Sequence, residues 1–142
     1  MATQQEMEAT YNYRDEIFRL SLGETGDITC AMYNGDFSKT LAQAKEDKHD
    51  YVLDALNFFP GFRMLDIGSG WGPMLRAAKE RGGHGVGVTL STKHAESCRR
   101  NGLEAYVKGL EGCLRRDLRQ VRRRREPGSI RTLLFDRRLP RR

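Results

Sequence analysis

Residues 63–72, which read R-M-L-D-I-G-S-G-W-G, constrain the fold more than any other part of the chain. The apolar run 64–67 predicts a short buried strand, and Gly68, Gly70 and Gly72 predict a tight turn directly after it. Glycine is the residue that lets a backbone turn sharply and approach a ligand closely. A strand followed by such a turn is typical of an α/β protein that binds a nucleotide-like cofactor.

The residues after the turn predict the start of a helix. Pro73 suits a first helical position, where its fixed φ and missing N–H cost nothing. The helix is predicted over 74–81, with Gly82-Gly83 as its end. Free N–H groups at a helix start favour polar or anionic ligand groups, so the sequence predicts a cofactor cradle. The alternative is a strand-to-helix turn without a ligand, because a glycine triplet alone is weak evidence.

A second strand is predicted one helix later, over His84–Ser91, which reads H-G-V-G-V-T-L-S. This spacing is typical of a βαβ unit with a parallel sheet. In dinucleotide-binding units the second strand often ends in an acidic residue that binds the ribose hydroxyls. Here Thr89, Leu90 and Ser91 end the strand, so the dinucleotide interpretation weakens, although hydroxyl groups can still bind a ribose.

The rest of the first 108 residues predicts further helices and one more strand. Residues 23–36 are predicted to be irregular, and His49 and His84 are interpreted as ordinary surface histidines. The apolar face of the longest helix is expected to pack on the sheet rather than on a membrane. The predicted helices are 11–22, 41–59 and 92–101, the last ending at Gly102, and the predicted strand is 103–107.

Length and cysteine content limit the classes of protein that fit. A chain of 142 residues is long enough for one small domain. Cys30, Cys98 and Cys113 are odd in number and show no metal-ligand spacing, so we expect free thiols in a reducing cytoplasm and no metal site. The first residues show no signal peptide, and no apolar run is long enough for a membrane span.

The net charge of +6 is unevenly distributed. Residues 109–142 contain twelve arginines and four acidic residues, a net charge of +8, whereas residues 1–108 contain 13 basic and 15 acidic residues, a net charge of −2. Clustered arginines repel one another in a compact element. We therefore predict a disordered or irregular basic tail that begins after Lys108.

Several motifs together are similar to a known family. L-D-I-G-S-G-W-G followed by G-V-T-L-S resembles the S-adenosylmethionine-dependent cyclopropane-fatty-acyl-phospholipid synthases and mycolic acid methyltransferases. Tyr11–Gly23 and Ile28–Tyr33 resemble the opening segments of the same family, so the resemblance covers roughly residues 11–108. It implies an incomplete Rossmann-like class I methyltransferase fold, with an N-terminal helical or lid segment at 1–40 and a partial cofactor-binding domain at 41–108.

The resemblance also implies site residues. Cys30 would help to hold a bicarbonate ion, which is the proposed base of the intact family. Three positions depart from the family pattern, namely Ile28 for tyrosine, Ser69 for cysteine and His94 for glutamine. The residues implied to bind S-adenosylmethionine are Ile28, Thr29, Asp66, Gly68, Ser69, Gly70, Trp71, Gly72, Thr89, Leu90 and His94.

The arginine-rich tail admits two interpretations. Basic clusters bind nucleic acid or an acidic membrane surface, although Phe135 is the one aromatic residue available for stacking. Alternatively, residues 109–142 are read out of frame. With permitted codons and one leading base dropped, the neighbouring frame can encode F-D-A-V and then G-A-F-E-H-F, which resembles the family's continuation. We favour the second interpretation, and the DNA sequence around the Lys108 codon tests it.

The sequence therefore predicts an inactive N-terminal fragment of a methyltransferase. The intact family would transfer methyl to the double bond of an unsaturated acyl lipid, with peripheral membrane contact rather than nucleic-acid binding. Two alternatives stay open: a small non-enzymatic protein with a basic arm, and a methyltransferase for another small molecule, because a cofactor loop does not report the acceptor.

Overall fold

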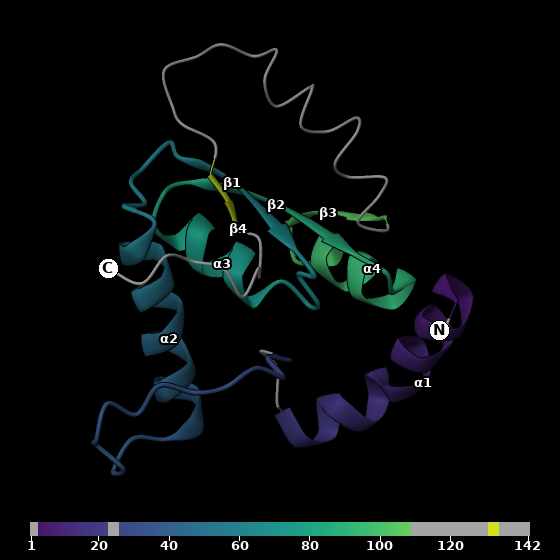
Figure 1. The fold of residues 1–142 in the computed structure, drawn as a ribbon, viewed down its shortest axis with the longest axis horizontal. Coiled ribbons are helices and arrows are strands. Elements are labelled where there is room, and N and C mark those ends of the chain that lie inside the picture. The colour runs from purple at the N-terminus through teal and green to yellow at the C-terminus, as the bar shows by residue number, and fades with distance from the viewer. Residues whose placement is uncertain (1–2, 23–25, 109–130, 134–142) are drawn as a thin grey trace.

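A computed structural model of the chain describes residues 3–22, 26–108 and 131–133, and these residues form an α/β fold with a parallel sheet (Figure 1). The strand order in the sheet is β3-β2-β1-β4. All three neighbouring strand pairs are parallel. The elements are α1 (Gln4–Leu22), α2 (Leu41–Ala55), β1 (Arg63–Ile67), α3 (Pro73–Glu80), β2 (His84–Thr89), α4 (Thr92–Arg100), β3 (Glu104–Val107) and β4 (Arg131–Leu133).

The alternation of glycine and valine in β2 explains how α3 comes close to the sheet. A Cβ atom at Gly85 would lie 2.8 Å from Leu75 Cδ2, and one at Gly87 would lie 2.7 Å from Leu75 Cδ1. Val86 and Val88 pack with Leu65 on the opposite face. Successive side chains of a strand point to opposite faces, so the period-two pattern gives α3 its close approach on one face and apolar packing on the other.

The main core lies between the sheet and the helices on one face. Met64 of β1 and Ala105 of β3 belong to it, together with residues from α2, α3 and α4. The second cluster, on the other face, consists of strand residues in the part of the chain that the structure describes. The buried members of the main core are Leu53, Phe62, Met64, Leu75, Ala78, Ala95, Cys98, Leu103 and Ala105.

The helix ends follow local backbone hydrogen bonding. As predicted, α3 and α4 end before glycines: Gly83 N donates to Ala78 O, and Leu103 N donates to Cys98 O. The predicted end of α2 at residue 59 is wrong, because the helix ends at Ala55. Asn57 has φ of 50° there, and the next N–H, that of Phe58, donates to Leu53 O. This is a Schellman motif with asparagine at the left-handed position, an alternative to the commoner glycine.

Phe58 and Phe59 leave the helix and pack against Phe62. The ring centroids of Phe58 and Phe62 are 4.9 Å apart, and those of Phe59 and Phe62 are 5.2 Å apart. The aromatic residues that extended the predicted helix therefore connect α2 to the start of β1. Phe58 also packs against the main core, so these apolar residues are used after the helix end rather than within the helix.

Two further differences concern element lengths. Helix α1 begins at Gln4 instead of Tyr11, so it is longer than predicted. Strand β2 ends at Thr89, because Ser91 caps α4 and its side chain accepts a hydrogen bond from His94 N. A serine at the N-cap satisfies one of the free N–H groups of the first helical turn, which decides whether Ser91 ends a strand or begins a helix.

The described part of the arginine-rich tail is a strand rather than irregular chain. Residues 131–133 pair with β1 in parallel register, with Met64 opposite Arg131 and Asp66 opposite Leu133. Strand pairing depends on backbone groups, which charge repulsion between side chains does not abolish. The other tail residues, to which both interpretations of the tail apply, lie outside the described residues. Within the described ranges, none of the helices is both long and apolar enough to cross a bilayer.

Candidate functional site

The glycine loop, residues 68–72, lies where β1 ends and is fixed to the neighbouring strand. Gly68 N and Ser69 N both donate hydrogen bonds to Val88 O, at 2.8 and 3.0 Å. The Ser69 hydroxyl also donates to Val88 O at 3.4 Å, and Ser69 is buried. The loop therefore sits across the carboxyl ends of β1 and β2, which is where ligands bind in open parallel sheets.

The three glycines of the loop have different surroundings, although all three have positive φ. At Gly68 (φ 85°) and Gly70 (φ 52°) an added Cβ would meet nothing within 4 Å. At Gly72 (φ 82°) an added Cβ would lie 2.9 Å from Cys98 Sγ and 3.0 Å from Leu103 Cδ1. Gly72 thus allows close packing of helix on sheet, whereas Gly68 and Gly70 border open space.

The end of β2 supplies the second side of the candidate site. Thr89 is buried, its hydroxyl accepts a hydrogen bond from Ser91 N at 3.3 Å, and its carbonyl accepts one from Lys108 N. Leu90, which lies between Thr89 and Ser91 in the chain, is half-buried. Thr89 and Leu90 directly follow Val88, to which the glycine loop is hydrogen-bonded, and the Thr89 hydroxyl already has a local partner.

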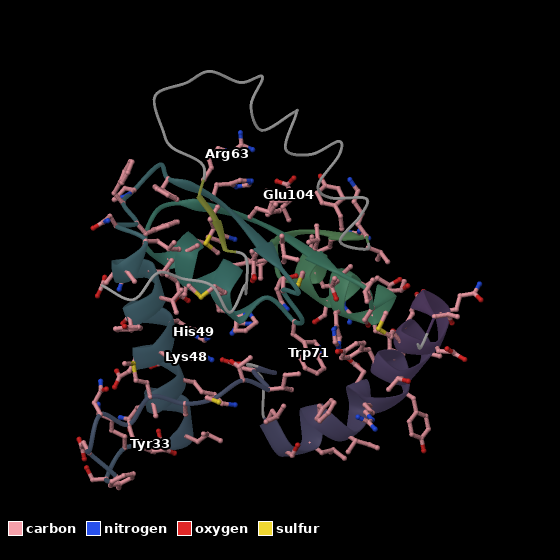
Figure 2. All side chains as sticks on the ribbon, viewed as in Figure 1. Tyr33, Lys48, His49, Arg63, Trp71 and Glu104 are labelled. Atoms are coloured by element: carbon pink, nitrogen blue, oxygen red, sulfur yellow. The ribbon has the colours of Figure 1, made fainter. Side chains whose placement is uncertain are left out.

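Trp71 joins the loop to α1. Its indole Nε1–H donates to Asp15 Oδ1 at 2.6 Å, and both residues are buried. The Trp71 and His94 rings lie with their centroids 4.1 Å apart, and His94 Nε2 lies 3.6 Å from Asp15 Oδ1. We call Asp15, Trp71 and His94 the Trp71 cluster. Figure 2 shows Trp71 between the sheet and α1.

Helix α1 is held against α4 by further polar contacts. The Ser91 hydroxyl donates to Asn12 Oδ1 at 2.7 Å, and the Thr92 hydroxyl donates to Glu8 Oε1 at 2.5 Å. Both hydroxyls lie at the start of α4, directly after β2. Helix α1 therefore lies beside the start of α4 (Figure 1) and contacts the loop through Trp71.

The segment 26–30 approaches the glycine loop from the other side. A Cβ atom at Gly26 would lie 2.8 Å from the Trp71 ring, so the backbone of Gly26 packs directly on the indole. Ile28 is 51 % exposed, and Thr29 and Cys30 are also exposed. Gly26 and Asp27 are thus buried, whereas the next three residues, which were predicted to contact the cofactor and the base, are exposed to solvent.

Asp27 is the centre of a group of polar contacts that the sequence did not predict. Its carboxylate accepts hydrogen bonds from Lys48 Nζ, and His49 Nε2 lies 2.8 Å from its Oδ2. Although burial alone would raise the pKa of Asp27, the hydrogen bonds from His49, Lys48 and Thr29 outweigh it and hold that pKa far below the ordinary value. The interpretation of His49 as a surface histidine is wrong, because the ring is buried against Asp27. His84 is exposed, as predicted.

Asp66, on the strand that leads into the glycine loop, is a buried carboxyl group. Burial raises its pKa to about 6, while the nearby charge of His49 lowers it and that of Asp27 raises it. Asp66 thus titrates close to neutral pH, unlike an exposed aspartate.

We expect Asp66→Asn to remove a pH dependence of stability. Since the folded-state pKa of Asp66 lies above its ordinary value of 3.8, its favourable contribution is present below about pH 4 and is lost as pH rises through about 6. The wild-type free energy of unfolding should therefore fall by about 2 kcal/mol more than that of the variant between pH 4.5 and 7.5. Urea unfolding at both pH values measures this difference. Equal changes in the two proteins would contradict the assignment.

The cysteines differ sharply in environment. Cys30 is exposed, whereas Cys98 is buried in the core, and burial raises the pKa of its thiol to about 11. A thiol with such a pKa is a poor nucleophile at neutral pH. Among the described side chains, His, Cys, Asp and Glu nowhere gather in a group of three that could hold a metal ion.

Comparisons with known proteins agree on one family. The sequence family described as mycolic acid cyclopropane synthetase matches residues 1–122. Cyclopropane mycolic acid synthase 3 of Mycobacterium tuberculosis is 41 % identical over 90 residues, which are 63 % of this chain and 31 % of that protein. The chain thus spans about a third of the length of this relative.

Solved structures agree with the sequence comparison. The cyclopropane synthase MmaA2 from Mycobacterium tuberculosis superposes with a TM-score of 0.71 and 30 % identity, covering 78 % of this chain and 42 % of that one. Mycolic acid cyclopropane synthase CmaA1 complexed with SAH and CTAB gives a TM-score of 0.69 and 31 % identity, with 78 % and 41 % coverage. The predicted fold, an incomplete Rossmann-like methyltransferase domain, is confirmed.

Proposed function

Because the chain belongs to the mycolic acid cyclopropane synthetase family, we propose that its glycine loop holds S-adenosylmethionine for methyl transfer to the double bond of an unsaturated lipid acyl chain. One observation carries the cofactor assignment. Gly68 and Gly70 border open space at the carboxyl ends of β1 and β2, where an added Cβ atom would meet no protein atom within 4 Å. The crystal structure of CmaA1, a relative with 31 % identity, is a complex with SAH.

The residues around this space would have different roles in binding the cofactor. The backbone of Gly68 and Gly70 would lie along the cofactor, with Ser69 holding the loop to β2 and with Thr89 and Leu90 beside the ribose and adenine. Gly72, Trp71 and His94 would fix the shape of the site from behind, because their contacts are with the core and with α1. Ile28 and Thr29 would close the site from the exposed segment.

Asp66 and Cys30 are the groups with chemistry to contribute. When bound, S-adenosylmethionine supplies an electrophilic methyl group on a sulfonium centre. A carboxyl group with a pKa of about 6 becomes an anion when a cation is placed near it, so cofactor affinity should rise as pH rises through that range. Cys30, which is exposed beside Thr29, would help to hold the base, for which bicarbonate is the candidate.

We also propose that this chain carries the cofactor half of the enzyme without completing the reaction. The chain spans 31 % of Cyclopropane mycolic acid synthase 3. Residues 109–142, read in the neighbouring frame, can supply the G-A-F-E-H-F segment that the resemblance associates with the active site. The out-of-frame interpretation therefore belongs to this proposal and is tested together with the activity.

Two measurements on two proteins test the proposed function. The first protein is the 142-residue chain, and the second has the neighbouring frame from the Lys108 codon onward. We expect calorimetric titration to show S-adenosylhomocysteine binding to both, and labelled methyl transfer from S-adenosylmethionine to vesicles of unsaturated phospholipid by the second alone. Absence of binding to both would overturn the cofactor assignment, and methyl transfer by the 142-residue chain would overturn the claim that it is inactive.

A further inference from the structure

The exposed segment 28–30 is joined to α2 through one buried carboxylate, that of Asp27. The Asp27 side chain is 3 % exposed, and its two oxygens have different partners. Oδ1 accepts hydrogen bonds from Thr29 N at 2.9 Å and from the Thr29 hydroxyl at 2.5 Å. Oδ2 faces α2, where it accepts from Lys48 Nζ and lies 2.8 Å from His49 Nε2.

Helix α2 also reaches the backbone of the segment. Lys45 Nζ, which is buried, donates to the Asp27 carbonyl, and Lys48 Nζ also donates to the Thr29 hydroxyl. Figure 2 shows Lys48 and His49 on the side of α2 that faces the sheet. Lys45, Lys48 and His49 lie within two turns of one helix, so a single helix face supplies all three contacts.

The turn formed by Asp36 and Ser38 shows that an aspartate can close such a turn without contacts to α2. The Asp36 carboxylate accepts from Ser38 N at 3.0 Å and from the Ser38 hydroxyl at 2.6 Å, with the same residue spacing as Asp27 and Thr29. Asp36 is exposed. The additional feature of Asp27 is its burial between the segment and two cationic or basic side chains of α2, which is costly unless every charge is paired.

We propose that Asp27 is a positioning residue that holds the segment 28–30 at the glycine loop by connecting Thr29 to helix α2. The proposal rests on the proposed function only for the identity of the bound molecule. Thr29 is placed through both its amide and its hydroxyl, and Gly26, next to Asp27 on the other side, packs on the Trp71 ring of the loop. Asp27 therefore fixes the distance between α2, the loop and the exposed residues that would contact the cofactor.

Amide hydrogen exchange tests this inference without any ligand. Met32 N donates to Ala44 O of α2 at 2.7 Å, and Met32 has no hydrogen bond to Asp27 among those described, so its amide reports the attachment of the segment rather than the turn. In Asp27→Ala we expect the amides of both Thr29 and Met32 to exchange about tenfold faster or more, because a buried charge-assisted connection is lost. The amides of Val86 and Val88 in β2 should keep their protection.

Asp36→Ala is the matched control, since it removes an aspartate from the same kind of turn without touching α2. We expect it to accelerate exchange at Ser38 and to leave Met32 unchanged. If Asp27→Ala accelerates Thr29 alone, Asp27 merely closes a local turn and the proposal is overturned. If Asp27→Ala loses protection throughout the sheet, Asp27→Asn and Lys48→Met decide: faster exchange at Met32 supports the proposal, and unchanged exchange overturns it.

A titration with S-adenosylhomocysteine separates this inference from the proposed function. If the wild-type chain binds, Asp27→Ala should weaken binding about tenfold or more, and Asp36→Ala should not. Equal affinities in the wild type and Asp27→Ala would overturn the positioning role at the site. If the wild-type chain does not bind, the proposed function fails, while the exchange at Met32 still decides whether Asp27 holds the segment.

Discussion

Gly68→Ala should lower the affinity of the chain for S-adenosylhomocysteine by about tenfold or more, which corresponds to about 1.4 kcal/mol. The new Cβ would meet no protein atom within 4 Å, so it would project into the space assigned to the cofactor. A φ of 85° also strains an alanine, by about 1–2 kcal/mol. Isothermal titration calorimetry measures the affinity, and urea unfolding measures the strain separately.

Gly61→Ala provides the matched control for this experiment. Gly61 has a φ of 84°, and a Cβ there would also meet nothing within 4 Å, but Gly61 lies in the turn before β1. The two variants should therefore lose similar stability, whereas only Gly68→Ala should lose affinity. If both variants bind S-adenosylhomocysteine as the wild type does, the open space beside Gly68 is not the cofactor site.

Asp15→Ala should release Trp71 and with it the contact between α1 and the glycine loop. Trp71 is the single tryptophan of the chain and is 4 % exposed, so the fluorescence of the chain reports the surroundings of this one side chain. A buried hydrogen bond to a charged group contributes about 1.5–3 kcal/mol. We expect the emission maximum to shift to longer wavelength, acrylamide quenching to increase, and proteolytic cleavage within α1 to accelerate.

Two further variants show whether the effect belongs to the buried contact. Asp50→Ala removes an exposed carboxylate that lies 2.8 Å from Arg81, and it should leave the Trp71 emission unchanged. Asp15→Asn keeps an acceptor for the indole N–H but removes the charge, so it should give an intermediate shift. Wild-type emission in Asp15→Ala would show that α1 is held by other contacts.

Strands β1, β2 and β3, the glycine loop and most helix ends could be predicted because their causes are local, whereas β4 was not predicted. Gly82 and Gly102 follow the ends of α3 and α4, and the next residue's N–H donates in each case to a carbonyl five residues earlier, Gly83 N to Ala78 O and Leu103 N to Cys98 O. A short sequence window contains that distance. Asn57 ends α2 by the same geometry, yet the apolar residues after it extended the predicted helix. Phe58 and Phe59 pack on Phe62 after the chain has left the helix, and Phe58 also packs against the main core, so their apolar character did not indicate helix.

The polar contacts behind the site could not be predicted in this way. His49 lies 22 residues from Asp27, and Trp71 lies 56 residues from Asp15. Nothing near Asp27 in the sequence distinguishes it from Asp36, which makes the same local turn. Burial gives Asp27 its role, and burial depends on where α2 packs.

By itself the sequence determined the strand, the glycine loop and the helix that follows, because backbone conformation at glycines and helix ends depends on neighbouring residues. Which glycines border open space depends on the folded chain, since Gly72 packs against Cys98 while Gly68 and Gly70 do not. The fold also decides that β4 completes the edge of the sheet beside β1. Solvation, pKa and packing are set by segments far apart in the chain, so the fold had to bring them together first.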